Sequence, residues 1–360
     1  MSRVAVATID LGALKHNLSI VRSHAPDSKV LVVIKADAYG HGLIPVADAL
    51  SSADGFAVAH HEEALSLRAV YKTQRIVLLQ GFTDNAQLVE LLEARIEPVV
   101  HSSYQIEMLE RANLQHAFPA WLKVDTGMNR LGLCATEFNT AWQRLNAVQA
   151  LRGNIHIVSH FANADDKKHP GTDEQIKLFQ ALTQQCNAEK SLANSAGLMH
   201  WPNSQMDWVR PGIMLYGASP FANETAAALN LKPVMTLKSR IIAINSLRQG
   251  EAVGYGHTWR AQRDCHLAVV AMGYGDGYPR HIEQNTPVLI NQQHYNIVGR
   301  VSMDMVCVEL PINHRLNIGD EVVFWGDGLP VEIIASQAGT ISYELFCQVT
   351  PRVKFEYING

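Results

Sequence analysis

Short apolar runs alternate with helix-compatible segments over the first two-thirds of this 360-residue chain, and this alternation limits its possible folds more than any other feature. The runs are short and mostly apolar, which is typical of strands buried on both faces of a parallel sheet. Amphipathic segments such as HHEEALSLRAVYK and NAQLVELLEARI lie between most of them. Eight such runs occur, at Val30–Ile34, Phe56–Ala59, Ile76–Leu79, Pro98–Val100, Ala120–Val124, Ile155–Ser159, Ser191–Asn194 and Ile213–Tyr216. Eight strands separated by helices predict an α/β fold with an N-terminal (β/α)8 barrel of the TIM type over residues 1–230.

The alternation ends near Leu231, where strand-like runs follow one another without helices between them. Turn signals such as RQGE, GYGDG, NIGD and WGDG separate these runs. They are Val234–Ile244, His266–Ala271, Pro287–Ile290, Met305–Leu310 and Glu321–Trp325. We therefore expect a mainly antiparallel β domain over residues 231–360. A first strand, at about residues 3–9, is expected to pair with this domain, and Asp10 to cap the helix that follows it.

Composition excludes several classes of protein. A hydrophobic fraction of 47% is enough for a large core, and a net charge of −4 gives no basic surface for nucleic acid or an anionic membrane. No apolar run approaches transmembrane length, and the N-terminus lacks the apolar core of a signal peptide. Because the five cysteines are scattered and form no CxxC pair, we expect reduced thiols and a cytoplasmic protein.

Polar residues cluster at the carboxyl ends of the predicted barrel strands, where TIM barrels place their catalytic groups. They are Lys35 after the first strand, Lys123 and Arg130 in KVDTGMNRLG, His160, Asn194, Ser195, and Arg210 to Ile213, which would open the eighth strand. An amine at the mouth of an apolar sheet has a lowered pKa because burial disfavours its charged form. A lysine, two arginines, a histidine and a Ser/Gly phosphate cradle suit an enzyme of pyridoxal phosphate, which binds lysine as a Schiff base.

Seven motifs then match one family in order: VIKADAYGHG, LKVDTGMNRLG, ANSAG, VRPGIMLYG, GYGHTW, GYGDGY and GRVSMDMV. On these residues the chain resembles the bacterial alanine racemases over essentially its whole length. The resemblance implies a fold-type III enzyme that binds pyridoxal 5′-phosphate and acts as a head-to-tail homodimer on L-alanine and D-alanine. It also implies two bases: Lys35, which holds the cofactor and serves D-alanine, and Tyr255 of the partner subunit, which serves L-alanine. An ordinary tyrosine has a pKa of ~10, which is too high for a base that acts at neutral pH. His160 and Arg210 are therefore expected to lower the pKa of Tyr255.

The resemblance assigns further roles residue by residue. Arg210 is similar to the arginine that hydrogen-bonds the pyridine nitrogen, and Arg130 to the residue that contacts the cofactor phenolate and the substrate carboxylate. Lys123 matches a lysine that is often carbamylated to orient that arginine. The cofactor-binding set also includes Asn194, and the phosphate-binding positions are Tyr39, Ser195, Gly212 and Ile213. Met303 and Asp304 match residues whose backbone groups approach the substrate carboxylate from the second subunit. The chain departs from some members at Pro351, where they carry a tyrosine that contacts the phosphate.

Ordinary structural roles compete with several of these assignments. Lys35 could be a surface lysine with a buried stem, Lys123 could pair with Asp125, and the two arginines could form structural ion pairs. His156 and His160 could suggest a metal pair, but no third ligand is evident and a metal site is not expected. Other functions left open are a broader-specificity amino-acid racemase, a basic-amino-acid decarboxylase and a non-catalytic pyridoxal phosphate-binding protein. A racemase could supply D-alanine for peptidoglycan or serve alanine breakdown, and both roles share these motifs.

Overall fold

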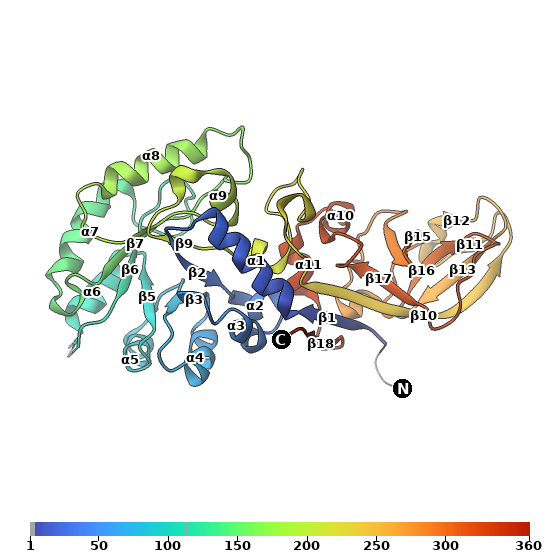
Figure 1. The fold of residues 1–360 in the computed structure, drawn as a ribbon, viewed down its shortest axis with the longest axis horizontal. Helices are drawn as coiled ribbons and strands as arrows, with labels where there is room; N and C mark the ends of the chain where they lie inside the picture. The colour runs from blue at the N-terminus through green and yellow to red at the C-terminus, as the bar shows by residue number, and fades with distance from the viewer. Residues whose placement is uncertain (1–3, 113, 115) are drawn as a thin grey trace. The chain divides into compact units, whose positions relative to one another are not determined.

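The computed structural model describes residues 4–112, 114 and 116–360, which fall into two compact units (Figure 1). The first, the barrel unit, consists of the described residues within 17–38 and 42–215. The second, the β unit, consists of residues 4–16, 39–41 and 216–360. Within the described part of the chain, no helix combines the length and the apolar character needed to cross a membrane.

The barrel unit is built on eight parallel strands that close on themselves, because the first strand pairs with the last at Lys29 and Trp208. The strands are β2 (Lys29–Val33), β3 (Gly55–Val58), β4 (Ile76–Leu78), β5 (Glu97–Val100), β6 (Ala120–Lys123), β7 (Ile155–Val158), β8 (Lys190–Ser191) and β9 (Trp208–Val209). Their apolar side chains are almost all buried, as expected for strands covered on both faces. The (β/α)8 barrel expected from the sequence is therefore confirmed.

Helices connect the barrel strands, and α4 to α8 lie outside them in Figure 1. The helices are α1 (Leu11–His24), α2 (Lys35–Gly40), α3 (Leu43–Ala49), α4 (His61–Val70), α5 (Asn85–Glu93), α6 (Ser103–Arg111), α7 (Ala135–Ala147), α8 (Gly171–Thr183) and α9 (Ser195–His200). Each of α4 and α5 coincides with one of the amphipathic segments found in the sequence. Asp10 caps α1 as predicted, since its Oδ1 accepts a hydrogen bond from the backbone N–H of Ala13 at 3.0 Å.

The predicted position of the eighth strand, Ile213–Tyr216, is wrong. These four residues form a 3-10 helix, η3 (Ile213–Tyr216), and the eighth strand is the two-residue β9 that precedes it. The residues of η3 are fully buried, and a short buried apolar run cannot be assigned to strand or helix from its pattern alone. The consequence for the site is that Arg210 follows the last barrel strand at its carboxyl end, whereas the sequence had placed it at the start of that strand.

The β unit contains an eight-stranded sheet in the order β13-β16-β15-β14-β17-β10-β1-β18, in which all pairs except β1 with β18 are antiparallel. Its strands are β1 (Val6–Asp10), β10 (Met235–Leu247), β13 (Cys265–Val270), β14 (Pro287–Ile290), β15 (Gln293–Val298), β16 (Val306–Leu310), β17 (Glu321–Trp325) and β18 (Lys354–Ile358). A small hairpin joins β11 (Ala252–Val253) to β12 (Trp259–Arg260), and two helices, α10 (Val331–Gln337) and α11 (Ser342–Gln348), precede β18. The antiparallel C-terminal domain is confirmed, although these two helices were not expected.

Candidate active site

Lys35 leaves the barrel where β2 ends. The strand before it is buried, and the backbone N–H of Ile34 still bonds to the carbonyl of Ala57 in the neighbouring strand at 2.9 Å. Lys35 is the first residue of α2, and its side chain is half-buried. The strand therefore delivers the amine to the carboxyl-terminal mouth of the barrel, as the sequence predicted.

The turn that follows Lys35 is left-handed. Ala36, Asp37, Ala38 and Tyr39 have φ values between 51° and 55°, and four successive non-glycine residues in this region are costly, at about 1–2 kcal/mol each. The Asp37 carboxylate holds the turn by accepting the backbone N–H of Leu43 at 2.7 Å, and the Asp37 N–H donates to Glu63 at 3.2 Å. Strain of this kind persists only where the surroundings enforce it, and it concentrates at functional sites.

Arg210 lies buried beside the end of β9, with 5% of its surface exposed. Its Nη1 donates to the hydroxyl of Ser191 and its Nη2 to the carbonyl of Ser159, both at 2.6 Å. No carboxylate among the described residues pairs with it, so its partners are all neutral. Burial lowers the pKa of Arg210 to about 10, which leaves the guanidinium charged at neutral pH.

His160, two residues beyond β7, lies next to this guanidinium. Its Nδ1 is 3.4 Å from Nη2 of Arg210, which donates, so the imidazole hydrogen belongs on Nε2. Burial, followed by the positive charges of Arg210 and Lys123, lowers the pKa of His160 well below its ordinary value. The imidazole is therefore neutral.

Lys123 ends β6, and Arg130 lies in the loop that follows it. Burial, then the charges of Arg210 and Arg130, lowers the pKa of Lys123 to about 8, against the opposing effect of Asp125. The Asp125 carboxylate shapes the loop by accepting the backbone N–H groups of Gly127 at 2.8 Å, Met128 at 3.0 Å and Arg130 at 3.2 Å. We call Lys35, Lys123, Arg130 and Arg210 the cationic cluster. Because their charges act on one another, the cluster favours an anionic ligand.

The predicted phosphate residues of the barrel unit meet at the start of α9. Asn194 caps this helix, its Oδ1 accepting the N–H of Gly197 at 2.9 Å. The Ser195 hydroxyl accepts the N–H of Gly212 at 2.9 Å, which joins the loop after β8 to the loop after β9. Ile213 follows at once as the buried first residue of η3.

In the β unit, the predicted site residues Tyr255 and Met303 are exposed, at 69% and 53%. Tyr255 opens a 3-10 turn, η5 (Tyr255–His257), and stands between Gly254 and Gly256, which have φ values of 69° and 71°. Asp304 pairs with Arg352, which also contacts Asp276. Exposure of this degree leaves the Tyr255 ring available to another molecule.

Tyr39, also in the β unit, stacks on Tyr216 with ring centroids 4.6 Å apart. Burial raises its pKa, and the neighbouring Tyr343 adds to the effect. The Tyr343 ring, on α11, lies 5.9 Å from that of Tyr39. Sequence reasoning missed Tyr343, which stands in ISYEL, a stretch without a recognisable pattern; the only hint was the absence of a tyrosine at Pro351.

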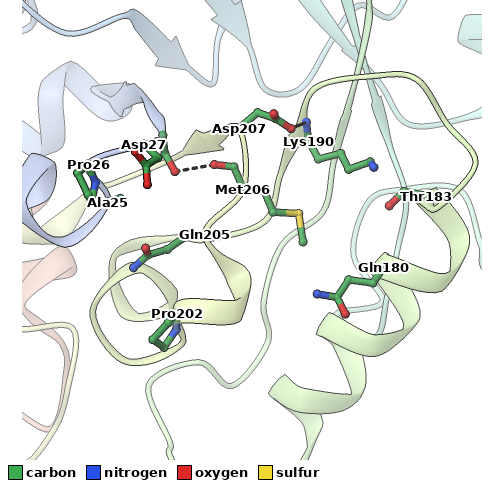
Figure 2. Close-up of a pocket in the computed structure, with 11 residues that line it drawn as sticks. Ala25, Pro26, Asp27, Gln180, Thr183, Lys190, Pro202, Gln205, Met206 and Asp207 are labelled. Atoms are coloured by element: carbon green, nitrogen blue, oxygen red, sulfur yellow. Dashed lines mark hydrogen bonds between the residues drawn. The ribbon is translucent and has the colours of Figure 1, made fainter.

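A separate polar cavity of about 570 Å³ lies at the amino-terminal ends of the barrel strands (Figure 2). Its lining includes Ser28, Lys190 and Asp207, which stand at or just before the starts of β2, β8 and β9. None of the predicted site residues lines this cavity, and those of the barrel unit stand at or after the other, carboxyl-terminal ends of the barrel strands. The candidate active site is therefore the opposite, carboxyl-terminal mouth.

His156 and His160 do not act together. Nε2 of His156 lies 3.1 Å from Nη1 of Arg75 and its Nδ1 3.5 Å from Glu189, toward the amino-terminal end of the barrel. Among the described residues, no group of three or more metal-binding side chains comes together.

Two family descriptions match the chain: "Alanine racemase, N-terminal domain" over residues 9–220 and "Alanine racemase, C-terminal domain" over residues 234–357. An alanine racemase of Aeromonas hydrophila is 49% identical over 356 residues, which are 99% of this chain and 100% of that protein. An alanine racemase of Shewanella woodyi is 48% identical, over 96% of this chain and 97% of its own.

Solved structures give the same result. The biosynthetic alanine racemase of Pseudomonas aeruginosa superposes with a TM-score of 0.96 at 42% identity, covering 99% of both chains. The alanine racemase of Bartonella henselae with covalently bound pyridoxal phosphate superposes with a TM-score of 0.90 at 32% identity, again over 99% of both.

Proposed function

Because the chain belongs to the alanine racemase family and is therefore an isomerase of amino acids, we propose that it interconverts L-alanine and D-alanine with pyridoxal 5′-phosphate and two bases. The observation that carries this proposal is the placement of Lys35 at the mouth of the barrel, among cations that include a buried arginine whose partners in the described part of the chain are all neutral.

The residues present fit the cofactor. Pyridoxal phosphate is an anion with a phosphate and a phenolate, and the cationic cluster together with Ser195, Gly212 and Ile213 offers charge and hydrogen-bonding groups for both. Lys35 would hold the cofactor covalently. The similar alanine racemase of Bartonella henselae is described with covalently bound pyridoxal phosphate, which supports this role. When bound, pyridoxal phosphate supplies an electron sink that stabilises the negative charge left when the α-proton of the amino acid is removed.

Arg210 is the residue that would limit side reactions. An arginine with a pKa of about 10 keeps its proton at neutral pH, so Arg210 would donate to the pyridine nitrogen and leave that nitrogen unprotonated. An unprotonated ring would be a weaker electron sink, which would favour rapid return of the proton over competing reactions. A basic-amino-acid decarboxylase would benefit from a protonated pyridine nitrogen and therefore from an acidic residue at this position. The presence of Arg210 argues against that alternative.

Arg130 would bind the substrate carboxylate and the cofactor phenolate. Lys123, with a pKa of about 8, is partly neutral at physiological pH, and only a neutral amine reacts with carbon dioxide to form a carbamate. A carbamylated Lys123 would turn one cation of the cluster into an anion that orients Arg130. Met303 and Asp304 would approach the substrate carboxylate from the partner subunit.

For the phosphate, we propose Asn194, Ser195, Gly212 and Ile213 from the barrel unit and Tyr39 from the β unit. Within the β unit the Tyr343 ring lies 5.9 Å from that of Tyr39, and Pro351 supplies no hydroxyl of its own.

Racemisation requires a proton donor on each face of the substrate α-carbon. Lys35 would serve one face, and Tyr255 of a second copy the other, within a homodimer. The 69% exposure of Tyr255 in a single chain supports this arrangement, because a catalytic tyrosine gains nothing from facing solvent. Because His160 is neutral, Arg210 is the one of these two residues that carries a positive charge. All five cysteines lie in the described residues without a disulfide, which supports a cytoplasmic location.

The test is turnover of L-alanine by the cofactor-loaded protein in D2O. We expect equal amounts of the two enantiomers at equilibrium, with deuterium at the α-carbon of both. L-Serine, L-lysine and L-ornithine are assayed in parallel. Efficient racemisation of serine or lysine would indicate a broader-specificity racemase. Release of carbon dioxide from lysine or ornithine would indicate a decarboxylase. A folded protein that binds the cofactor but exchanges no α-proton would be a non-catalytic binder, and the proposal would be wrong.

A further inference from the structure

We infer that Gln175, on α8, is a positioning residue that ties together the two loops carrying Arg130 and His160. The inference rests on the proposed function, because it assigns these loops to the substrate and cofactor. No motif that led to the site includes Gln175.

Gln175 is buried, with 3% of its surface exposed, and its side-chain amide is fully engaged. Its Nε2 donates to the hydroxyl of Thr126 at 3.1 Å, in the loop after β6. The same nitrogen donates to the carbonyl of His160 at 3.0 Å, and Oε1 accepts the backbone N–H of Ala162 at 2.9 Å, both in the loop after β7. An amide has two N–H donors and one carbonyl, so a single glutamine spans both loops with all of its hydrogen-bonding groups.

The connection continues from Thr126 to Arg210. Thr126 and Ser159 are both buried, and their hydroxyl oxygens lie 2.8 Å apart. The carbonyl of Ser159 in turn accepts Nη2 of Arg210 at 2.6 Å. Gln175 therefore stands at one end of a buried polar chain whose other end is the guanidinium assigned to the pyridine nitrogen.

Packing alone does not explain a glutamine at this place. The neighbouring buried side chains of α8 include Ile176 and Phe179, and an apolar residue could fill the position of Gln175 in the same way. A leucine would, however, leave the Ala162 N–H without the acceptor and the His160 carbonyl without the donor that Gln175 supplies, and it would remove one of the two hydrogen bonds of the Thr126 hydroxyl. The two loops could then shift independently, and a displacement of about 1 Å at a catalytic group can cost 100-fold in rate.

The test compares Gln175→Leu and Gln175→Glu with Gln180→Leu, a control on the same helix whose side chain is exposed and outside the proposed machinery. For Gln175→Leu we expect kcat/KM for L-alanine to fall at least tenfold, with a higher KM, at temperatures well below its melting temperature. Gln180→Leu should match the wild type. A Gln175→Leu protein that melts earlier but keeps the wild-type KM would have lost only stability, and the inference would be wrong.

Gln175→Glu adds a pH signature that a purely structural role would not give. An ionised glutamate cannot donate to the His160 carbonyl, whereas the protonated acid can, and burial raises its pKa. We therefore expect the KM of Gln175→Glu, divided by that of the wild type, to fall as the pH is lowered from 8 to 6. A ratio that does not change with pH would count against the inference.

Amide hydrogen exchange separates this inference from the proposed function, because it needs no turnover. In Gln175→Leu we expect faster exchange at Ala162 and at Gly127 to Arg130, with no change in the β unit and none in Gln180→Leu. If the wild type fails to racemise alanine but this exchange pattern appears, the loop connection holds and the assigned reaction is wrong. Unchanged exchange in both loops would overturn the connection itself.

Discussion

Nε of Arg75 lies 3.0 Å from Oε1 of Glu97 at the amino-terminal end of the barrel, the end remote from the candidate active site. Glu97 is buried, and its second oxygen accepts the indole N–H of Trp121 at 2.8 Å. Burial raises the pKa of Glu97, and Arg75 opposes that rise. The carboxylate thus depends on its arginine partner.

We expect Arg75→Leu to lower the free energy of unfolding by about 3–5 kcal/mol at neutral pH, because it leaves a buried carboxylate unpaired. The double variant Arg75→Leu/Glu97→Leu should recover part of this loss, since it removes both charges. Urea denaturation, monitored by tryptophan fluorescence, measures the free energy of unfolding of the wild type, of each single variant and of the double variant. Trp121 and Trp208 serve as local probes. If the double variant is less stable than the wild type by the sum of the losses measured for Arg75→Leu and Glu97→Leu, the pair is not coupled.

His156 makes the same end of the barrel sensitive to acid. Burial, followed by the charge of Arg75, lowers its pKa from 6.5 to about 4, and 9% of the residue is exposed. A histidine with a lowered pKa in the folded state contributes stability that is complete above pH 6.5 and is lost as the pH falls towards 4. The total loss is about 3 kcal/mol.

Melting temperatures measured between pH 7.5 and pH 4 test this expectation. His156→Gln should flatten the profile between pH 6.5 and 4, whereas His24→Gln, an exposed histidine at the end of α1, should leave it as in the wild type. A His156→Gln profile as steep as that of the wild type would show that other groups cause the acid sensitivity.

The left-handed turn after Lys35 predicts an unusual effect of glycine. Ala36 is exposed and has a φ of 54°, where glycine avoids the strain that alanine suffers. Ala36→Gly should therefore leave stability unchanged or raise it by up to about 1 kcal/mol. The control is Ala69→Gly, at an exposed position of the right-handed helix α4, which should lower stability by about 0.5–1 kcal/mol. Equal losses in the two variants would mean that the turn is not strained in solution.

Much of this architecture could be predicted from the sequence because barrel strands are buried on both faces and stand out as apolar runs. Lys35 and His160 could be placed at the mouth for the same reason, since they follow such runs directly. The two-residue strand β9 could not be found, because Trp208 and Val209 are too few to form a pattern beside the longer apolar run of η3.

Gln175 and Tyr343 could not be predicted for a different reason. Gln175 meets Thr126 across 49 residues of chain, and Tyr343 meets Tyr39 only after the β unit has folded. Neither stands in a motif, so only the tertiary structure reveals their partners. The charged network of Arg75, Glu97 and His156 was missed likewise, because a glutamate at the start of a buried strand has no signal of its own.

Lys35→Ala tests the covalent attachment of the cofactor separately from turnover. We expect the variant to lose the visible absorbance of lysine-bound pyridoxal phosphate together with activity, because no other amine can take the place of Lys35. The neighbouring Lys123→Ala, which alters the cationic cluster without removing Lys35, should keep that absorbance. Retention of the absorbance in Lys35→Ala would show that another lysine holds the cofactor.

Hybrid dimers test whether Tyr255 serves the partner's site. If each site combines Lys35 of one subunit with Tyr255 of the other, a hybrid of Lys35→Ala and Tyr255→Phe subunits has one intact site and one doubly altered site. An equal mixture that exchanges subunits freely should therefore regain about a quarter of the wild-type activity, although each variant alone is inactive. The control mixes Lys35→Ala with Arg130→Ala, two changes that both lie in the barrel unit. Every site of this hybrid then lacks either Lys35 or Arg130. The activity of the mixture should therefore not exceed the residual activity of the Arg130→Ala variant. If mass spectrometry confirms that hybrid dimers have formed but the mixture of Lys35→Ala and Tyr255→Phe regains no activity, both bases act in one chain.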